Sequence, residues 1–135
     1  RTAAYGTGWQ AAAETPEEAG KVVDKILAGA DQHKRCIDSD HFGAGFGIHF
    51  GSWRDEPVTK MAADFEKRTG HAASRGFVVG GADEILQRIQ AYADHGISKF
   101  ILRPIGAGDA QMEDQTEQLL DGVLSKVSQI RERSL

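Results

Sequence analysis

The stretch over residues 80–106 most constrains the fold of this chain, because it predicts a helix, a turn and a strand in immediate succession. Its first half spaces apolar side chains as a helix lying on one surface does. Acidic residues open that helix, and Gly96 follows it as a left-handed cap would. A short apolar run at residues 100–102, closed by Pro104, then predicts a strand buried on both faces. Since these pieces make half of a βαβ unit, we expect a parallel sheet. The apolar helix positions are Ile85, Leu86, Ile89, Tyr92 and Ala93.

The same alternation of helix and strand occurs earlier in the chain. Thr15, Pro16 and Glu18 form a capping box with proline at the first helical position, which predicts a helix reaching about His33. Residues 42–51 alternate large apolar side chains with glycine or histidine, a period of two that predicts a strand. The glycines on one face indicate a close neighbour, either packed protein or a ligand, and packing is the favoured alternative. Residues 8–11 predict a short strand or strand end.

Two further helices complete the expected order of elements. Residues 52–74 are expected to be an insertion that holds an amphipathic helix over 57–68, ended by Gly70. Residues 106–109 lead into a final helix. The expected order is strand, helix, strand, insertion, helix, strand, helix. This order predicts an α/β fold with a parallel sheet and right-handed crossovers, either a small open sheet or part of a (β/α)8 barrel. The expected inward side chains are Val58, Met61, Ala62 and Phe65 in the insertion, and Leu119, Leu120, Val123, Leu124, Val127 and Ile130 in the final helix.

Length and composition exclude several classes of protein. The 135 residues allow one domain or less, taken here as a single segment over 1–135. No apolar run approaches the roughly 20 residues of a membrane span, and the sequence does not open like a signal peptide. The net charge of −4, with basic residues scattered, argues against nucleic acid as a partner. A single cysteine, Cys36, favours a reducing cytoplasm. Because the chain opens on Arg1 without a methionine, we expect a fragment or a processed product.

Five short segments occur in order with natural spacing: YGTGW (5–9), TPEE (15–18), VVGGADE (78–84), AYADHGI (91–97) and FILRP (100–104). Together they resemble the C-terminal part of a luciferase-like monooxygenase, a family of bacterial-luciferase-like flavin enzymes and their deazaflavin-dependent relatives. The resemblance implies a (β/α)8 TIM barrel, of which this chain would hold strands six to eight with their covering helices. A whole barrel needs roughly 250 residues, so the resemblance implies an incomplete chain. Thr7 stands where the family usually has an acidic residue.

Residues at the carboxyl ends of the strands are the first candidates for a site, since barrels of this type place their active face there. We place Trp9, the segment 49–53 and the segment 103–106 at these ends. Trp9 could face the isoalloxazine ring or the substrate, and His49 could donate to either of them. Arg103 could hold a loop carboxylate or reach the cofactor phosphate. The alternative for each is structural: a core tryptophan, a hydrogen-bonded core histidine and a paired arginine.

Arg75, Gly80 and Gly81 are a second candidate, for phosphate. A cation beside a helix N-terminus and a glycine pair suits an anion, and the alternative is a surface arginine before an ordinary helix start. The glycines do not form GxGxxG, so a Rossmann fold has little support. No metal site is predicted, because no standard zinc spacing appears among His33, Cys36, Asp38 and His41.

The resemblance implies an oxidoreductase for the whole protein, with no catalytic residue identified in this chain. The first expectation is a flavin-dependent monooxygenase, in which reduced FMN reacts with oxygen and a small organic substrate is oxygenated. One alternative is hydride transfer with a deazaflavin coenzyme, and another is a non-catalytic flavin-binding protein or an α/β interaction domain. With about three of the eight strands, the chain alone is expected to be inactive. Open sheet edges would favour a homo-oligomer or association with the missing N-terminal half.

Overall fold

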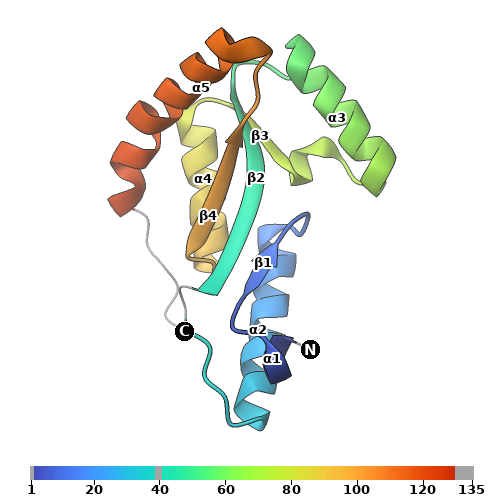
Figure 1. Ribbon diagram of the computed structural model, residues 1–135, viewed down its shortest axis with the longest axis vertical. Coiled ribbons are helices and arrows are strands. Elements are labelled where there is room, and N and C mark those ends of the chain that lie inside the picture. The colour runs from blue at the N-terminus through green and yellow to red at the C-terminus, as the bar shows by residue number, and fades with distance from the viewer. Residues whose placement is uncertain (1, 39–40, 130–135) are drawn as a thin grey trace. The chain divides into compact units, whose positions relative to one another are not determined.

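The computed structural model describes residues 2–38 and 41–129, in which helices and parallel strands alternate (Figure 1). Two compact units can be distinguished: residues up to 45 with 89–101, and residues 46–88 with 102–129. Their boundary passes through β2, α4 and β4. The elements are α1 (Thr2–Tyr5), β1 (Trp9–Ala11), α2 (Pro16–Gln32), β2 (Phe42–Phe50), α3 (Glu56–Thr69), the 3-10 helix η2 (Ala73–Arg75), β3 (Phe77–Gly80), α4 (Ala82–Asp94), β4 (Lys99–Pro104), α5 (Gly108–Gly122) and the 3-10 helix η3 (Leu124–Gln129).

In the first unit, β1 runs parallel to the start of β2, with Trp9 opposite Phe42. The start of β4 also joins β2, since Ser98 N donates to Phe42 O at 3.0 Å. The Tyr92 hydroxyl on α4 donates to the Glu14 carbonyl at 2.6 Å, and its ring packs edge-on against Phe100 of β4. The apolar face of α2 is buried as its spacing predicts. Its buried members are Ala19, Gly20, Val23, Ile26 and Ala30.

The capping box at the start of α2 is confirmed. The Thr15 hydroxyl accepts from Glu18 N, and the Glu18 carboxylate accepts from Thr15 N, with Pro16 at the first position. Replacing Thr15 by alanine should therefore lower the free energy of unfolding by about 1 kcal/mol, because one helix amide loses its acceptor. Urea unfolding followed by circular dichroism measures this. Thr116→Ala is the control, because Thr116 is exposed and lies in the middle of α5, away from its ends. An equal loss of stability there would contradict the capping role.

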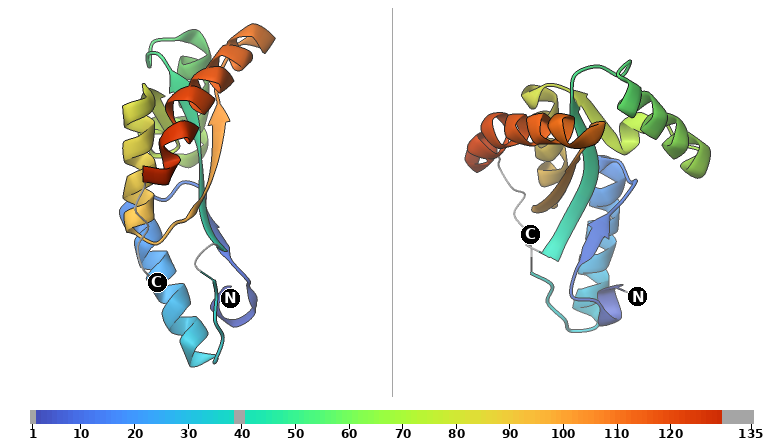
Figure 2. Two further views of the ribbon diagram at one scale, coloured as in Figure 1. Left: turned by 90° about the vertical axis from the view of Figure 1, so that its left-hand side faces the viewer. Right: turned by 45° about the horizontal axis from the view of Figure 1, so that its top comes forward.

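In the second unit, β3 pairs parallel with the end of β2, from Gly47 opposite Phe77 to Phe50 opposite Gly80. The end of β4 joins β2 through Ile105 N, which donates to Ile48 O at 2.9 Å. Figure 2 shows α3 leaving from the end of β2 and α5 leaving from the end of β4. The core of this unit includes Phe46, Ile48, Val58, Ile85 and Val123, each at most 1% exposed.

Glycine in β2 allows close packing. A Cβ at Gly47 would overlap the Phe77 ring and approach the Ile105 side chain. In the first unit, a Cβ at Gly43 would come within 3.5 Å of Lys99. Packed protein therefore occupies the space beside Gly47, as the sequence favoured, whereas the contacts beside Gly43 are at ordinary packing distance.

Three details of the sequence prediction are wrong. β3 is a strand that the expected order of elements did not contain. β4 is not buried on both faces: Phe100 and Leu102 are half-buried, whereas Ile101 is 52% exposed, with Lys99 and Arg103 exposed beside it. The apolar faces of α3 and α5 are narrower than expected. Met61 is exposed on α3. Of the apolar side chains expected to face inward from the final helix, Leu119 and Val123 are buried, Leu120, Leu124 and Val127 are exposed, and Ile130 lies outside the described residues.

Other predicted features agree with the structure. Gly70 ends α3 in the left-handed conformation with φ 73°, and Gly96 follows α4 with φ 97°. Within the described ranges no helix combines the length and apolar character that a membrane-spanning segment requires. The status of 52–74 as an insertion stays a prediction.

Candidate functional site

A pocket lies within the second unit, where the carboxyl ends of β2 and β4 meet the starts of α3 and α5. Its volume is about 510 Å³, within the range of small-molecule sites. Barrels of parallel strands carry their active sites at this end. We call it the rim pocket, and it is lined by His49, Phe50, Asp55, Glu56, Pro57, Ala107, Ala110, Gln111, Asp114 and Gln115.

His49 is the buried polar residue at the end of β2, with only 4% of its surface exposed. Its Nδ1 lies 2.7 Å from the Ile105 carbonyl oxygen, and its Nε2 lies 2.7 Å from Asp55 Oδ2. A carbonyl and an ionised carboxylate can only accept. The imidazolium form, with hydrogens on both nitrogens, therefore makes both bonds. Neither ring nitrogen is left to donate to a ligand in this arrangement, so His49 acts by holding Asp55.

Asp55 stands at the N-cap position of α3, and about 44% of its side chain is exposed. Its Oδ2 also accepts from Ser52 N at 3.0 Å. The Ser52 amide and then the His49 ring hold the pKa of Asp55 below its usual range. Glycine is required at position 51, because φ there is +153° and a Cβ would overlap the Asp55 carboxylate and approach the His49 ring.

Gln115 of α5 completes the end of β2. Its Oε1 accepts from Phe50 N at 2.7 Å, and its Nε2 donates to Phe50 O at 3.0 Å. Gln115 is buried, at 6% exposure. β4 has ended at Pro104, so this side-chain amide pairs with Phe50 as a neighbouring strand would. The chain after Ile105 is thereby free to turn away into α5, next to the pocket.

The charge of the rim pocket is one-sided. Apart from His49, its ionisable lining residues are Asp55, Glu56 and Asp114, all carboxylates, with no lysine or arginine. A phosphate group does not fit among these side chains, because like charges repel at short distance. Groups that carry N–H or O–H donors suit the lining, since carboxylate oxygens accept hydrogen bonds.

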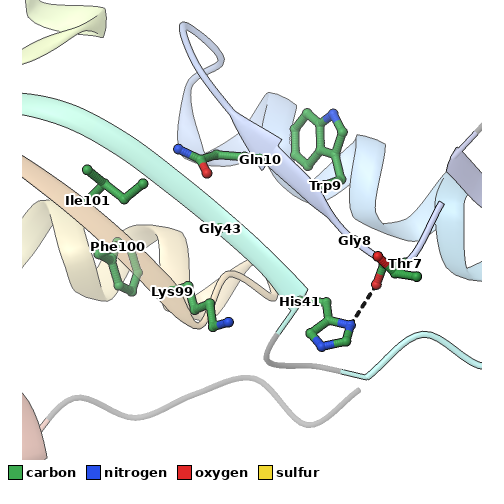
Figure 3. A pocket seen from close by; sticks show the side chains of 9 residues that line it. All are labelled: Thr7, Gly8, Trp9, Gln10, His41, Gly43, Lys99, Phe100 and Ile101. Carbon is green, nitrogen blue, oxygen red and sulfur yellow. Dashed lines mark hydrogen bonds between the residues drawn. The ribbon is translucent and has the colours of Figure 1, made fainter.

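Trp9 lies elsewhere than predicted. It begins β1 and is opposite the first residue of β2, so it stands at the amino end of its strand and not at the carboxyl end. It lines a different pocket of about 530 Å³ within the first unit, together with Gln10, Gly43 and Lys99 (Figure 3). His41 borders the same pocket, and its Nδ1 lies 2.7 Å from the Thr7 carbonyl oxygen. The predicted contact of Trp9 with a cofactor stays untested.

Gly80 and Gly81 lead into the start of α4, whereas Arg75 ends η2 before the amino end of β3, so the strand separates it from the glycine pair. The Gly81 amide donates to Glu84 Oε2 at 2.8 Å, and the pKa of Glu84 is lowered by its own backbone amide and then by that of Gly81. The helix's own carboxylate thus accepts from the Gly81 amide, and the predicted phosphate contact stays untested. Arg75 Nη1 lies 3.0 Å from His71 Nδ1.

Arg103 is exposed on β4. Neither it nor the Arg75 group lines the rim pocket. In the part of the chain that the structure describes, no three His, Cys, Asp or Glu side chains gather as a metal site requires.

Among the residues of the rim pocket that sequence reasoning missed are Asp55 and Gln115, whose side chains hydrogen-bond at the end of β2. Asp55 carries the signal of a helix N-cap, an aspartate directly before Glu-Pro. Gln115 lies four residues before Leu119 and eight before Val123, on the buried stripe of the final helix. A polar residue on an apolar stripe indicates a buried hydrogen-bonding partner, so the sequence could have predicted a structural role for Gln115.

No protein-family model matches this sequence, and no curated protein sequence does. Solved structures that are similar to it include the following two. One is the monooxygenase RslO1 from Streptomyces bottropensis, with 16% identity and a TM-score of 0.66 over 93% of this chain. The other is an F420-dependent secondary alcohol dehydrogenase in complex with an F420–acetone adduct, with 11% identity and a TM-score of 0.65 over 96% of this chain.

This chain covers 44% of the length of each of these two proteins. At such identities the likeness establishes the fold alone. The chain has an α/β fold of parallel strands with covering helices, corresponding to part of a (β/α)8 barrel.

Proposed function

We propose that this chain is part of a luciferase-like oxidoreductase that uses a flavin-type cofactor on a small organic substrate. The observation that carries the proposal is the rim pocket at the carboxyl ends of β2 and β4, in a fold shared with two oxidoreductases. Flavin-dependent monooxygenation is the first candidate reaction. Hydride transfer with a deazaflavin is the second, favoured by the similarity to the F420-dependent dehydrogenase.

The rim pocket suits part of such a cofactor. When bound, the cofactor would supply the redox chemistry, and the protein would orient it and exclude water. The carboxylates of Asp55, Glu56 and Asp114 would accept hydrogen bonds from the N–H groups of a flavin-type ring or from a hydroxyl or amino group of the substrate. The phosphate would have to be held away from this pocket, because the lining has no cation to pair with it.

The test of this pocket is binding of the ring without its phosphate. Riboflavin, titrated into the 135-residue chain and followed by fluorescence anisotropy, should bind with an affinity within about threefold of that of FMN, since the pocket has no place for phosphate. Ala110→Trp should weaken both at least about tenfold by filling the pocket. Glu117→Trp, on an exposed position of α5 outside the lining, is the matched control. Equal binding by both variants, or no binding by the wild type, would count against the proposal.

The isolated chain should show no turnover. It covers less than half the length of the two similar enzymes, and catalysis in a barrel draws residues from the ends of several strands. The measurement is product formation and oxygen consumption with reduced FMN, against reduced FMN alone as the background. Turnover above that background, and lost in Ala110→Trp, would refute the prediction.

A further inference from the structure

His49 and Asp55 hold together the segments that follow β2 and β4. The buried ring contacts the Ile105 carbonyl on one side and the Asp55 carboxylate on the other, each at 2.7 Å. We propose that these residues form a proton-controlled latch: the imidazolium of His49 ties Asp55 to the end of β4, and loss of one ring proton frees Asp55 to cap α3. This inference goes beyond the proposed function and does not depend on it.

The geometry requires one of the two bonds to break when the ring is neutral. A neutral imidazole carries a single N–H, so its other nitrogen would face an acceptor with a lone pair. The ring is 4% exposed, so water has little access to relieve that contact. Ile105 is held in place because its own N–H donates to Ile48 O. The Asp55 side chain is partly exposed and can move. The hydrogen bond between His49 and Asp55 is therefore the one that opens.

Asp55 has a second place to go. It is the N-cap residue of α3, yet its carboxylate makes no hydrogen bond to its own helix. An N-cap aspartate ordinarily accepts from the second or third helical amide. The second residue is Pro57, which has no N–H, so Val58 is left as the partner. Val58 N now donates to the Asp55 backbone carbonyl at 3.0 Å, within the same turn. The Val58 amide is therefore a donor that the released carboxylate can take over from the backbone carbonyl.

The two acceptors that His49 contacts set the direction of the pH dependence. His49 contacts the Asp55 carboxylate and the Ile105 carbonyl, and it shares the lining of the rim pocket with Glu56 from the start of α3 and Asp114 from α5. Both groups that His49 contacts are acceptors, so the two contacts are made together only when each ring nitrogen carries a hydrogen. The latch is closed while His49 is protonated and Asp55 is ionised. The lowered pKa of Asp55 extends the closed state to more acidic pH, and the latch opens when a rise in pH removes one ring proton from His49.

Nuclear magnetic resonance of the 135-residue chain between pH 5 and 8.5 tests the latch directly. The ring nitrogens of His49 should both carry hydrogens at low pH, with Nε2 losing its hydrogen as the pH rises. The Ser52 amide, which now donates to Asp55, and the Val58 amide should change in step with that loss. His49→Gln keeps a donor but cannot titrate, so both amide changes should disappear. His71→Gln, at an exposed histidine, should leave them intact.

Three results would overturn the latch: constant Ser52 and Val58 amides in the wild type, their titration in His49→Gln, or their loss in His71→Gln. Circular dichroism shows whether His49→Gln is folded. If it is not, Asp55→Asn takes its place, since asparagine can still cap a helix but carries no charge to favour the imidazolium. The Val58 change should then shrink at least fivefold, and an undiminished change would overturn the latch equally.

Discussion

Replacing Ile48 by alanine should lower the free energy of unfolding by about 2–5 kcal/mol, because the substitution leaves a cavity in a closely packed core. Ile48 is fully buried in β2, and its backbone lies between two strands. It is opposite Val78 of β3, and its carbonyl accepts from Ile105 N beyond β4. Urea unfolding followed by circular dichroism gives the loss directly.

Ile101→Ala is the matched control, because it deletes the same atoms from a side chain that is 52% exposed on β4. Its loss should be about 1 kcal/mol or less, since little apolar surface is newly exposed. Equal losses of stability at the two positions would contradict the exposure of the Ile101 side chain on β4. A size measurement by light scattering on wild type and Ile101→Ala would then show whether a second chain covers that face.

The long elements of this fold could be predicted from the sequence, and the short ones only in part. α2 has a capping box, β2 alternates large and small side chains over nine residues, and Gly96 follows the end of α4. Local signals therefore agree at each of these places. β3 has four residues between glycines, and what makes it a strand is its pairing with β2, which is distant in sequence. β4 has three adjacent apolar residues, too few to distinguish a buried run from an alternation.

The sequence predicted His49 as a residue of the candidate site, but it did not predict the hydrogen bonds that His49 makes there. His49 is recognisable as a polar side chain inside an apolar strand. Its partners are not, because Asp55 comes from a loop and the Ile105 group is a backbone carbonyl that carries no side-chain signal. Trp9 was placed at the wrong end of β1 because strand boundaries are poorly marked in sequence. A shift of three residues moves a side chain from one end of such a strand to the other.

Gln115→Leu should be the most damaging polar substitution in the rim pocket. Each buried group left without a partner costs about 1–3 kcal/mol, so the loss of both Phe50 bonds should lower the free energy of unfolding by about 2–4 kcal/mol once access of water through the pocket is allowed for. Leucine has a similar volume, and the loss would therefore report the hydrogen bonds and not a cavity. Hydrogen exchange at the Phe50 amide should accelerate more than exchange in α2, because the N–H has lost its acceptor.

Gln118→Leu is the control for Gln115→Leu. Gln118 lies one turn away on α5, is exposed, and donates only to Asp114 at 2.9 Å. An exposed side-chain pair of this kind contributes about 0.5 kcal/mol or less. If both substitutions lower the free energy of unfolding equally, the hydrogen bonds of Gln115 to Phe50 do not stabilise the end of β2. The space between β2 and α5 would then depend on the α5 apolar stripe alone, with Leu119 and Val123 as the residues that fix it.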